Sequence, residues 1–188
     1  MNVAPLEITT GATQPTAEGG EPYSVKLDAT GGIAPFTWSI VRGSLLTPGL
    51  MLDPATGVIS GTAAFSGSYS FAVSVTDSES PAQVADITES MTVIPQLLVA
   101  TTTLPAASVG SPYTAQLSAS GGVAPYTWSL VGGTQLPAGL SLSPDGSITG
   151  VPEAGGSAWF GVEVTDADDP PASRYDAVSM TIGFNIQG

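Results

Sequence analysis

The sequence contains no cysteine and no histidine, and its only basic residues are Lys26, Arg42 and Arg174. The first absence excludes disulfides and thiolate nucleophiles, and the second excludes Ser-His-Asp triads and ordinary zinc sites. The formal net charge is −13, with 16 acids and three bases, so little is available to neutralise phosphates. We therefore expect a protein that is not an enzyme and that does not bind nucleic acid.

Charged residues make up only 10% of the chain, and no apolar run is long enough to span a bilayer. Membrane insertion is not expected, and cations are the plausible small partners of so acidic a chain. A weakly charged surface rich in Ser and Thr is common in secreted β-proteins, which predicts an extracellular location. The start lacks the basic and apolar regions of a signal peptide, so we expect a segment of a longer protein.

The chain repeats itself. The motif A-P-[FY]-T-W-S occurs at 34–39 and again 90 residues later at 124–129. The motif F-x-V-x-V-T-D occurs at 71–77 and again 89 residues later at 160–166, so the second copy is one residue shorter in a turn. The sequence therefore predicts two domains, at 1–94 and 95–188, joined near Ile94-Pro95.

Apolar residues alternate with polar ones inside each copy, with the period of a strand. The clearest segments are 23–29, 36–40, 69–76 and the run that ends at 93, and turns rich in Pro and Gly separate them. This pattern predicts an all-β fold of two Greek-key sandwiches. Trp38 and Trp128 fall on the inward phase and are expected in the cores, while Glu89 conflicts with that phase and is expected at a frayed strand end.

The longest shared pattern resembles a known family. Both copies read G-x-P-Y-x-x-x-L-x-A-x-G-G-x-A-P-[FY]-T-W-S, followed by G-L-x-L, G-x-I-x-G and F-x-V-x-V-T-D. This is similar to the immunoglobulin-like repeat of bacterial surface proteins, which is related to cadherin-like, dystroglycan-type modules. The resemblance implies stalks and spacers in adhesins, or appendages of secreted enzymes and virion surfaces. Its Gly31-Gly32 and Gly121-Gly122 pairs are expected in tight turns with positive φ.

Acidic residues gather in two turns that we expect at facing poles of the two domains. The candidate ligands of an interdomain calcium ion are Glu18, Glu21, Asp166, Asp168 and Asp169. Oxygen ligands at alternate loop positions suit calcium, and the resemblance to cadherin-like modules implies that such an ion would stiffen the joint. The linker, however, lacks the acidic and amide ligands that cadherin linkers supply.

Two other interpretations of these acids stay open. They are solvated loop acids, or Asp77 and Asp166 cap turns through side-chain to backbone hydrogen bonds. A glycosidase carboxylate pair is disfavoured because nothing marks a cleft. The only lysine, Lys26, lies on the outward phase, which argues against an isopeptide cross-link.

Three apolar residues are candidate contacts with partners: Trp159, Phe184 and Ile186. Trp159 takes the place of Ser70 on the outward phase, where it either rests on a loop or binds a protein or carbohydrate. Phe184 and Ile186 continue the inward phase of the last strand beyond the length of the first copy. They indicate either a longer array of neighbouring repeats or a strand that pairs with another subunit.

The predicted function is that of a non-catalytic structural or adhesive module of an extracellular bacterial surface protein, which acts as a spacer or stalk. The alternative is a carbohydrate- or protein-binding accessory module of a secreted enzyme or a virion surface protein. No cofactor is required, apart from the calcium considered above.

Overall fold

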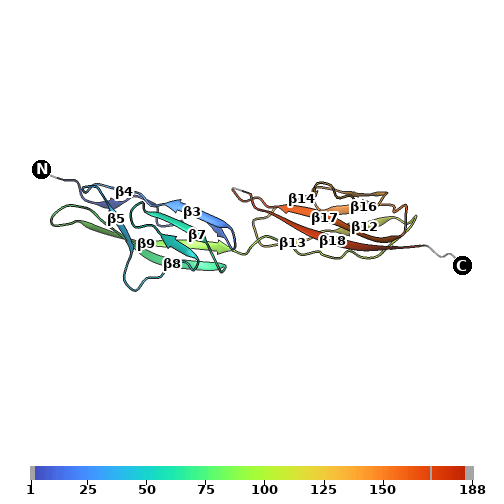
Figure 1. Ribbon diagram of the computed structural model, residues 1–188, viewed down its shortest axis with the longest axis horizontal. Helices are drawn as coiled ribbons and strands as arrows, with labels where there is room; N and C mark the ends of the chain where they lie inside the picture. The colour runs from blue at the N-terminus through green and yellow to red at the C-terminus, as the bar shows by residue number, and fades with distance from the viewer. Residues whose placement is uncertain (1–2, 170, 185–188) are drawn as a thin grey trace. The chain divides into compact units, whose positions relative to one another are not determined.

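The computed structural model describes residues 3–169 and 171–184. The regular secondary structure within these ranges consists of β-strands (Figure 1). The described residues therefore include no helix long and apolar enough to cross a membrane. The chain divides into two compact units, unit 1 at Met1–Gln96 and unit 2 at Leu97–Gly188. The prediction of an all-β chain is thus confirmed.

Unit 1 is a sandwich of two main sheets. The first has the strand order β2-β9-β8-β5, with β2 (Ala17–Glu18), β9 (Val84–Ile94), β8 (Gly67–Thr76) and β5 (Thr37–Ile40). The second has the order β3-β7-β6, with β3 (Pro22–Lys26), β7 (Val58–Thr62) and β6 (Leu50–Leu52). A short antiparallel ladder joins β1 (Glu7–Ile8) to β4 (Ala29–Thr30).

Unit 2 repeats this topology strand for strand. Its first sheet has the order β11-β18-β17-β14, with β11 (Ala107–Ser108), β18 (Ser173–Gly183), β17 (Gly156–Thr165) and β14 (Thr127–Leu130). Its second sheet has the order β12-β16-β15, with β12 (Tyr113–Gln116), β16 (Ser147–Gly150) and β15 (Leu140–Leu142). The ladder of β10 (Leu98–Val99) with β13 (Ala119–Ser120) completes the unit.

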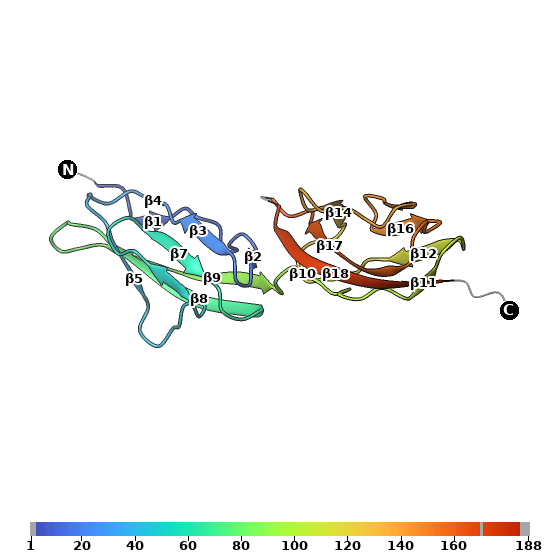
Figure 2. The ribbon, with the colours of Figure 1, turned by 45° about the vertical axis from the view of Figure 1, so that its right-hand side comes forward.

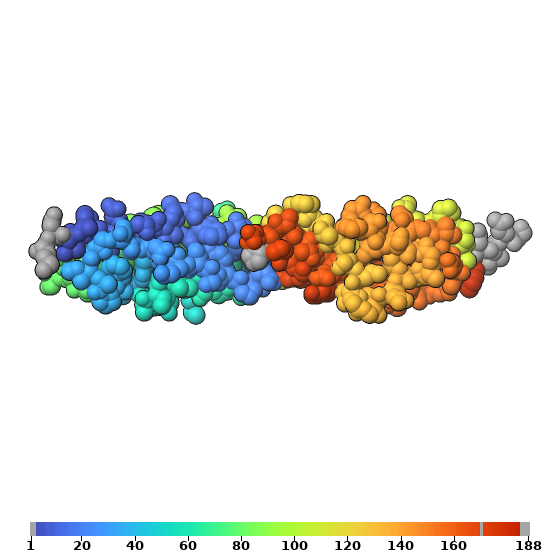
Figure 3. Space-filling model, turned by 90° about the horizontal axis from the view of Figure 1, so that it is seen from above, coloured from blue at the N-terminus to red at the C-terminus, as the bar shows by residue number. Residues whose placement is uncertain are grey.

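The sheets enclose one apolar core in each unit, as the alternating pattern requires. Val73 and Val75 on β8 are fully buried, and so are Val162 and Val164 on β17. The space-filling view in Figure 3 draws one outer face of each unit, beneath which these core residues are buried. Since apolar burial drives folding at roughly 25 cal/mol per Å², each core can hold its own unit together.

The two mid-strand tryptophans belong to these cores, which confirms their predicted role. Trp38 is 4% exposed and Trp128 is 5% exposed. Each indole lies against a glycine: a methyl group on Gly57 would come within 2.7 Å of Trp38 Nε1, and one on Gly146 within 2.8 Å of the Trp128 ring. Both glycines also have positive φ, so the repeated glycine serves both the turn and the tryptophan behind it.

Glu89 does not lie at a frayed strand end, and that prediction is wrong. It lies inside β9, opposite Phe71, and is completely buried. Its Oε2 accepts a hydrogen bond of 2.8 Å from Nε2 of Gln14, which is itself 4% exposed. The buried carboxyl is thus accommodated by a polar partner rather than by solvent at the end of a strand.

Candidate functional site

The second strand and the last strand of each unit lie side by side and run parallel. β2 pairs with β9 in unit 1, and β11 pairs with β18 in unit 2 (Figure 2). The pairing extends to earlier residues through isolated parallel bridges, which join Thr13 to Ser90 and Thr103 to Ser179. After its short first strand, each unit therefore places its next strand beside the strand along which the chain leaves.

Further hydrogen bonds hold these terminal segments. In unit 1, Ser90 donates its N–H to Ala12 O at 2.8 Å and accepts one from Gln14 N at 2.8 Å, while Gly19 N donates to Ile94 O at 2.9 Å. Unit 2 repeats the arrangement. Leu104 N donates to Ser179 O at 2.8 Å, Val109 N to Gly183 O at 2.9 Å, and Ser179 N to Thr102 O at 3.0 Å. We call these paired segments the terminal clamp of each unit: residues 12–19 with 90–94, and residues 102–109 with 179–183.

A buried aspartate organises the loop after β17 in unit 2. Asp166 is 6% exposed. Its Oδ1 accepts the N–H groups of Asp168 at 3.2 Å and Ala172 at 2.8 Å, within its own loop. Its Oδ2 accepts the N–H of Val123 at 2.8 Å, directly after the Gly121-Gly122 turn. One carboxylate therefore fastens two loops to each other.

Asp77 has the same role in unit 1. Its carboxylate accepts the N–H groups of Ile33 at 3.0 Å, Glu79 at 3.1 Å and Gln83 at 2.7 Å. Burial alone would raise the pKa of Asp77, but these three donors lower it below its ordinary value. Asp77 and Asp166 thus hold turns through backbone hydrogen bonds, one of the two roles that the sequence left open.

The Gly-Gly turns make this contact feasible. Gly31 and Gly32 have φ of 74° and 59°, and Gly121 and Gly122 have φ of 74° and 60°, which confirms the predicted positive values. A methyl group on Gly32 would come within 2.9 Å of Asp77 Oδ2. Glycine is therefore required here both for its conformation and for the close approach of the carboxylate.

The predicted calcium ligands divide between the units. Glu18 ends β2 and Glu21 follows it in unit 1, whereas Asp166, Asp168 and Asp169 follow β17 in unit 2. Within unit 2, the Asp166 carboxylate accepts the N–H of Asp168, and Asp168 Oδ1 accepts the N–H of Asp169 at 2.9 Å. These acids already organise their loop through backbone contacts, and calcium binding stays a prediction.

Trp159 is the most exposed tryptophan of the chain. It lies on β17 opposite Ser179 and is 73% exposed, which confirms its outward orientation. Beside it is an open hollow of about 260 Å³, to which Gln135, Pro137 and Ser157 contribute. Among the residues that the structure describes, those that line the hollow carry no charge, although the chain is strongly acidic. The sequence predicted Trp159 as a contact, but gave no sign of the hollow because its lining comes from separate loops.

Phe184 does not keep the inward orientation that alternation predicted. β18 ends at Gly183, and Phe184 just beyond it is 75% exposed. Its ring lies by Gly155, where an added methyl group would come within 2.8 Å. Once the strand ends, the backbone no longer directs alternate side chains into the core. A contact role for Phe184 stays a prediction, and Ile186 lies outside the described residues.

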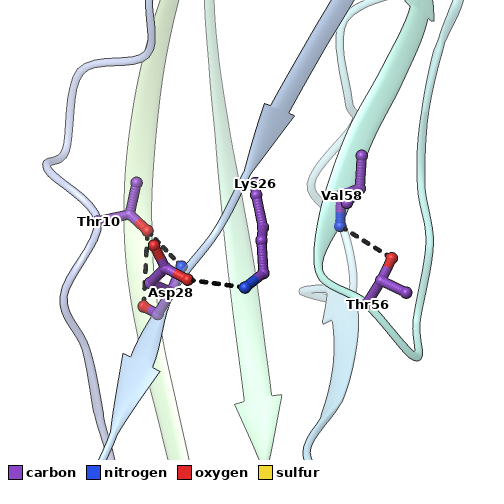
Figure 4. Close-up of polar contacts among 5 residues, drawn as sticks. All are labelled: Thr10, Lys26, Asp28, Thr56 and Val58. Atoms are coloured by element: carbon purple, nitrogen blue, oxygen red, sulfur yellow. Dashed lines mark hydrogen bonds and ion pairs between the residues drawn. The ribbon is translucent and has the colours of Figure 1, made fainter.

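Lys26 faces solvent on β3, as its outward phase predicted. Its Nζ lies 3.2 Å from Asp28 Oδ1, and the side chains of both residues are 65% exposed (Figure 4). Asp28 is held in turn by Thr10, whose Oγ1 accepts the Asp28 N–H at 2.6 Å. The ammonium group thus belongs to a surface ion pair rather than to a buried cross-link.

Two sandwiches, each with a seven-strand Greek-key order plus a short entry ladder, define tandem immunoglobulin-like domains. The family model described as "Putative Ig domain" matches residues 5–94 and again residues 95–183. The chain belongs to this family, whose domains are typically non-catalytic. No significant match was found among curated proteins.

Solved structures that resemble this chain include fragments of titin, of Drosophila OTK and of a protocadherin. The I-band fragment I67–I69 from titin is 12% identical with a TM-score of 0.50, and the match covers 96% of this chain and 66% of the fragment. The match to Drosophila OTK extracellular domains 3–5 is 12% identical with a TM-score of 0.48, and covers 96% and 62%. That to the protocadherin GammaB4 extracellular domain is 16% identical with a TM-score of 0.41, and covers 95% and 34%. This chain thus spans about a third of the protocadherin. The likeness to the titin fragment shows the fold alone.

Proposed function

We propose that the chain is a non-catalytic spacer of an extracellular surface protein, whose two domains transmit force between the segments at their ends. The observation that carries the proposal is the terminal clamp, which occurs in both units. The family match and the separate core of each unit also support it. An adhesive role would then belong to whatever the spacer presents.

The clamp has a mechanical consequence. Because β2 runs parallel to β9, and β11 to β18, pulling the two ends of a unit apart drives the paired strands in opposite directions along their length. The hydrogen bonds between them are then loaded together, in shear, rather than opened one after another. A parallel terminal pair therefore resists extension better than an antiparallel pair that unzips from one end.

Stretching the whole chain by its ends tests this role. We expect two separate unfolding events, each releasing about 300 Å of chain, which is the extended length of a unit of some ninety residues. Val109→Pro removes the N–H that reaches Gly183 O, a loss of about 1 kcal/mol. In single-molecule force spectroscopy, one of the two events should then occur about fivefold faster at a given force.

The second domain of the same molecule is the control, because its event should keep the wild-type rate. Ser108→Ala, a change of an exposed side chain within the clamp that keeps the backbone N–H groups, is a control for local disturbance. Unfolding of wild-type domains at forces too low to resolve would contradict the spacer proposal. An equal effect of Val109→Pro on both events would contradict the assignment of the clamp.

A second candidate function is the binding of a neutral glycan at Trp159, and the hollow beside it favours this candidate. An exposed indole offers a flat apolar face to a sugar ring, while Gln135 and Ser157 offer hydrogen-bonding groups. The absence of charge around the hollow suits a neutral ligand better than an ionic one.

Tryptophan fluorescence tests this binding, because Trp38 and Trp128 are buried and a ligand at the surface reports mainly through Trp159. Cellohexaose, xylohexaose and chitohexaose are suitable probes. If one binds, Trp159→Ala should weaken it about tenfold, the effect of losing roughly 1.5 kcal/mol of aromatic contact. No spectral change with any probe up to millimolar concentration would count against the candidate.

A further inference from the structure

Gln14 and Glu89 form a buried polar pair in unit 1 that has no counterpart in unit 2. Gln14 follows the Thr13–Ser90 bridge, and the residue that follows the matching Thr103–Ser179 bridge is Leu104. Glu89 is opposite Phe71 on the neighbouring strand, where unit 2 has Val178 opposite Phe160. Leu104 and Val178 are both buried, at 4% and 0% exposure. One domain therefore replaces an apolar pair of the other with an amide and a carboxyl.

When Glu89 is ionised, the hydrogen bonding of this pair is incomplete. Gln14 Nε2 donates to Glu89 Oε2 at 2.8 Å and approaches Gly11 O at 3.5 Å. The second oxygen of each group, Gln14 Oε1 and Glu89 Oε1, is buried and has no hydrogen-bond partner. Both atoms are acceptors, so neither can satisfy the other without a proton. An unsatisfied buried polar atom costs about 1 to 3 kcal/mol, and more when it carries charge.

We propose that this pair is a proton-binding site, in which native unit 1 holds Glu89 as the neutral acid. The added proton lies on Glu89 Oε1, and its O–H donates to Gln14 Oε1. An acid and a primary amide each present one donor and one acceptor in a plane, so two hydrogen bonds then close a ring. A single proton thus satisfies both orphaned oxygens and removes the buried charge.

The surroundings of Glu89 favour the neutral form. Burial raises its pKa, and the hydrogen bond from Gln14 offsets part of this rise, with no contribution from a cation. The facing titratable group is Tyr23 on β3, in the opposite sheet, and burial followed by the charge of Glu89 raises its pKa to about 12. Tyr23 is therefore neutral below that pH. Tyr69 on β8 also packs against this core, and its hydroxyl donates to Phe65 O at 2.9 Å, while the fully buried side chains of β5, β6, β7 and β8 are hydrophobic.

The site makes the stability of unit 1 depend on pH. Glu89 has a raised pKa in the folded unit, so its contribution is complete below the unfolded pKa of about 4.3 and is lost as the pH rises through the folded pKa. Within that window the folding equilibrium constant falls by up to tenfold per pH unit. Gln14 belongs to the terminal clamp, so deprotonation would also loosen the contact between the entering segment and β9.

Carbon NMR of the full chain, labelled at the side-chain carboxyl of glutamate, tests the protonation directly. We expect the Glu89 carboxyl signal to keep the position of a neutral acid at pH values where the exposed glutamates have ionised, and to shift at higher pH. Titration of Glu89 near pH 4.3, together with those residues, would overturn the proposal.

Two variants test the consequence for stability. Glu89→Gln keeps a donor and an acceptor in place of the acid, and the double variant Q14L/E89V copies the apolar pair of unit 2. Urea unfolding can be followed by the amide signals of β8, with those of β17 as the control from the other unit. Both variants should lose the fall in stability above pH 4.3, and a slope equal to that of the wild type in either one would refute the site.

Discussion

Replacing Trp128 with alanine should unfold unit 2 or lower its free energy of unfolding by about 3 to 5 kcal/mol. The indole is 95% buried, pairs across the sheet with Val164, and covers Gly146, so its removal leaves a cavity that the sandwich cannot refill by small shifts. Since a whole domain is stable by only about 5 to 15 kcal/mol, this is a large fraction of the total. Urea unfolding followed by the amide signals of β17 measures it.

Trp159→Ala in the same unit is the matched control. The same atoms are removed there from a side chain that is 73% exposed, so the free energy of unfolding should change by less than about 0.5 kcal/mol. The signals of β8 should report an unchanged unit 1 in both variants, because each unit has its own core. If the two tryptophan variants destabilise unit 2 equally, the assignment of one to the core and one to the surface is wrong.

The fold could be predicted because a strand repeats every two residues and the chain repeats every ninety. Alternation places Val73 and Val75 on one side of a strand, and the second copy reproduces the pattern with Val162 and Val164. Both signals are local, and they do not depend on which strand lies next to which. They fix the inward face of each strand, from which two apolar sheets and their packing follow.

Glu89 could not be placed in the same way, because its environment is not local. The alternation of apolar and polar residues predicts that Glu89 points into the core. Burying an isolated carboxylate costs too much free energy, so the end of a strand is the expected place for Glu89. The partner that makes burial feasible is Gln14, 75 residues earlier in the chain. A comparison of the copies does contain the signal, since both polar residues are replaced by apolar ones in the second copy.

For the candidate sites, too, the sequence predicted local features but not the contacts between residues far apart in the chain. The exposure of Trp159 follows from its outward phase, but the hollow beside it depends on loops at 135–138 and 154–157 that only the fold brings together. The inward phase of Phe184 fails because alternation holds only as far as the strand, and β18 ends one residue earlier. Asp77 and Asp166 were recognisable as acids in turns, whereas their contacts with Ile33 and Val123 span 44 and 43 residues.

Asp166→Ala should destabilise unit 2 by about 3 kcal/mol, the second largest effect that we expect. The substitution removes the acceptor of three backbone N–H groups. Where water does not fully replace the carboxylate, each lost hydrogen bond lowers the free energy of unfolding by about 1 kcal/mol or more. One of these donors, Val123, follows the Gly-Gly turn, so the loop after β17 also loses one of its connections to that turn, while the bond from Ala167 N to Val123 O remains. For a domain of this size the melting temperature should fall by about 12 °C or more.

Asp169→Ala is the control, because this exposed acid lies in the same loop and holds none of those N–H groups. Its effect on the melting temperature should be within about 2 °C, corresponding to less than 0.5 kcal/mol. Thermal melting in EDTA measures the effect of the backbone hydrogen bonds without calcium. Melting in millimolar calcium tests the predicted ion, which would raise the melting temperature of the wild type. Equal destabilisation by both variants in EDTA would mean that loop charge, rather than hydrogen bonding to the backbone, sets the stability of this loop. If Asp166→Ala alone is destabilising, as we expect, its carboxylate is a structural fastener with or without calcium.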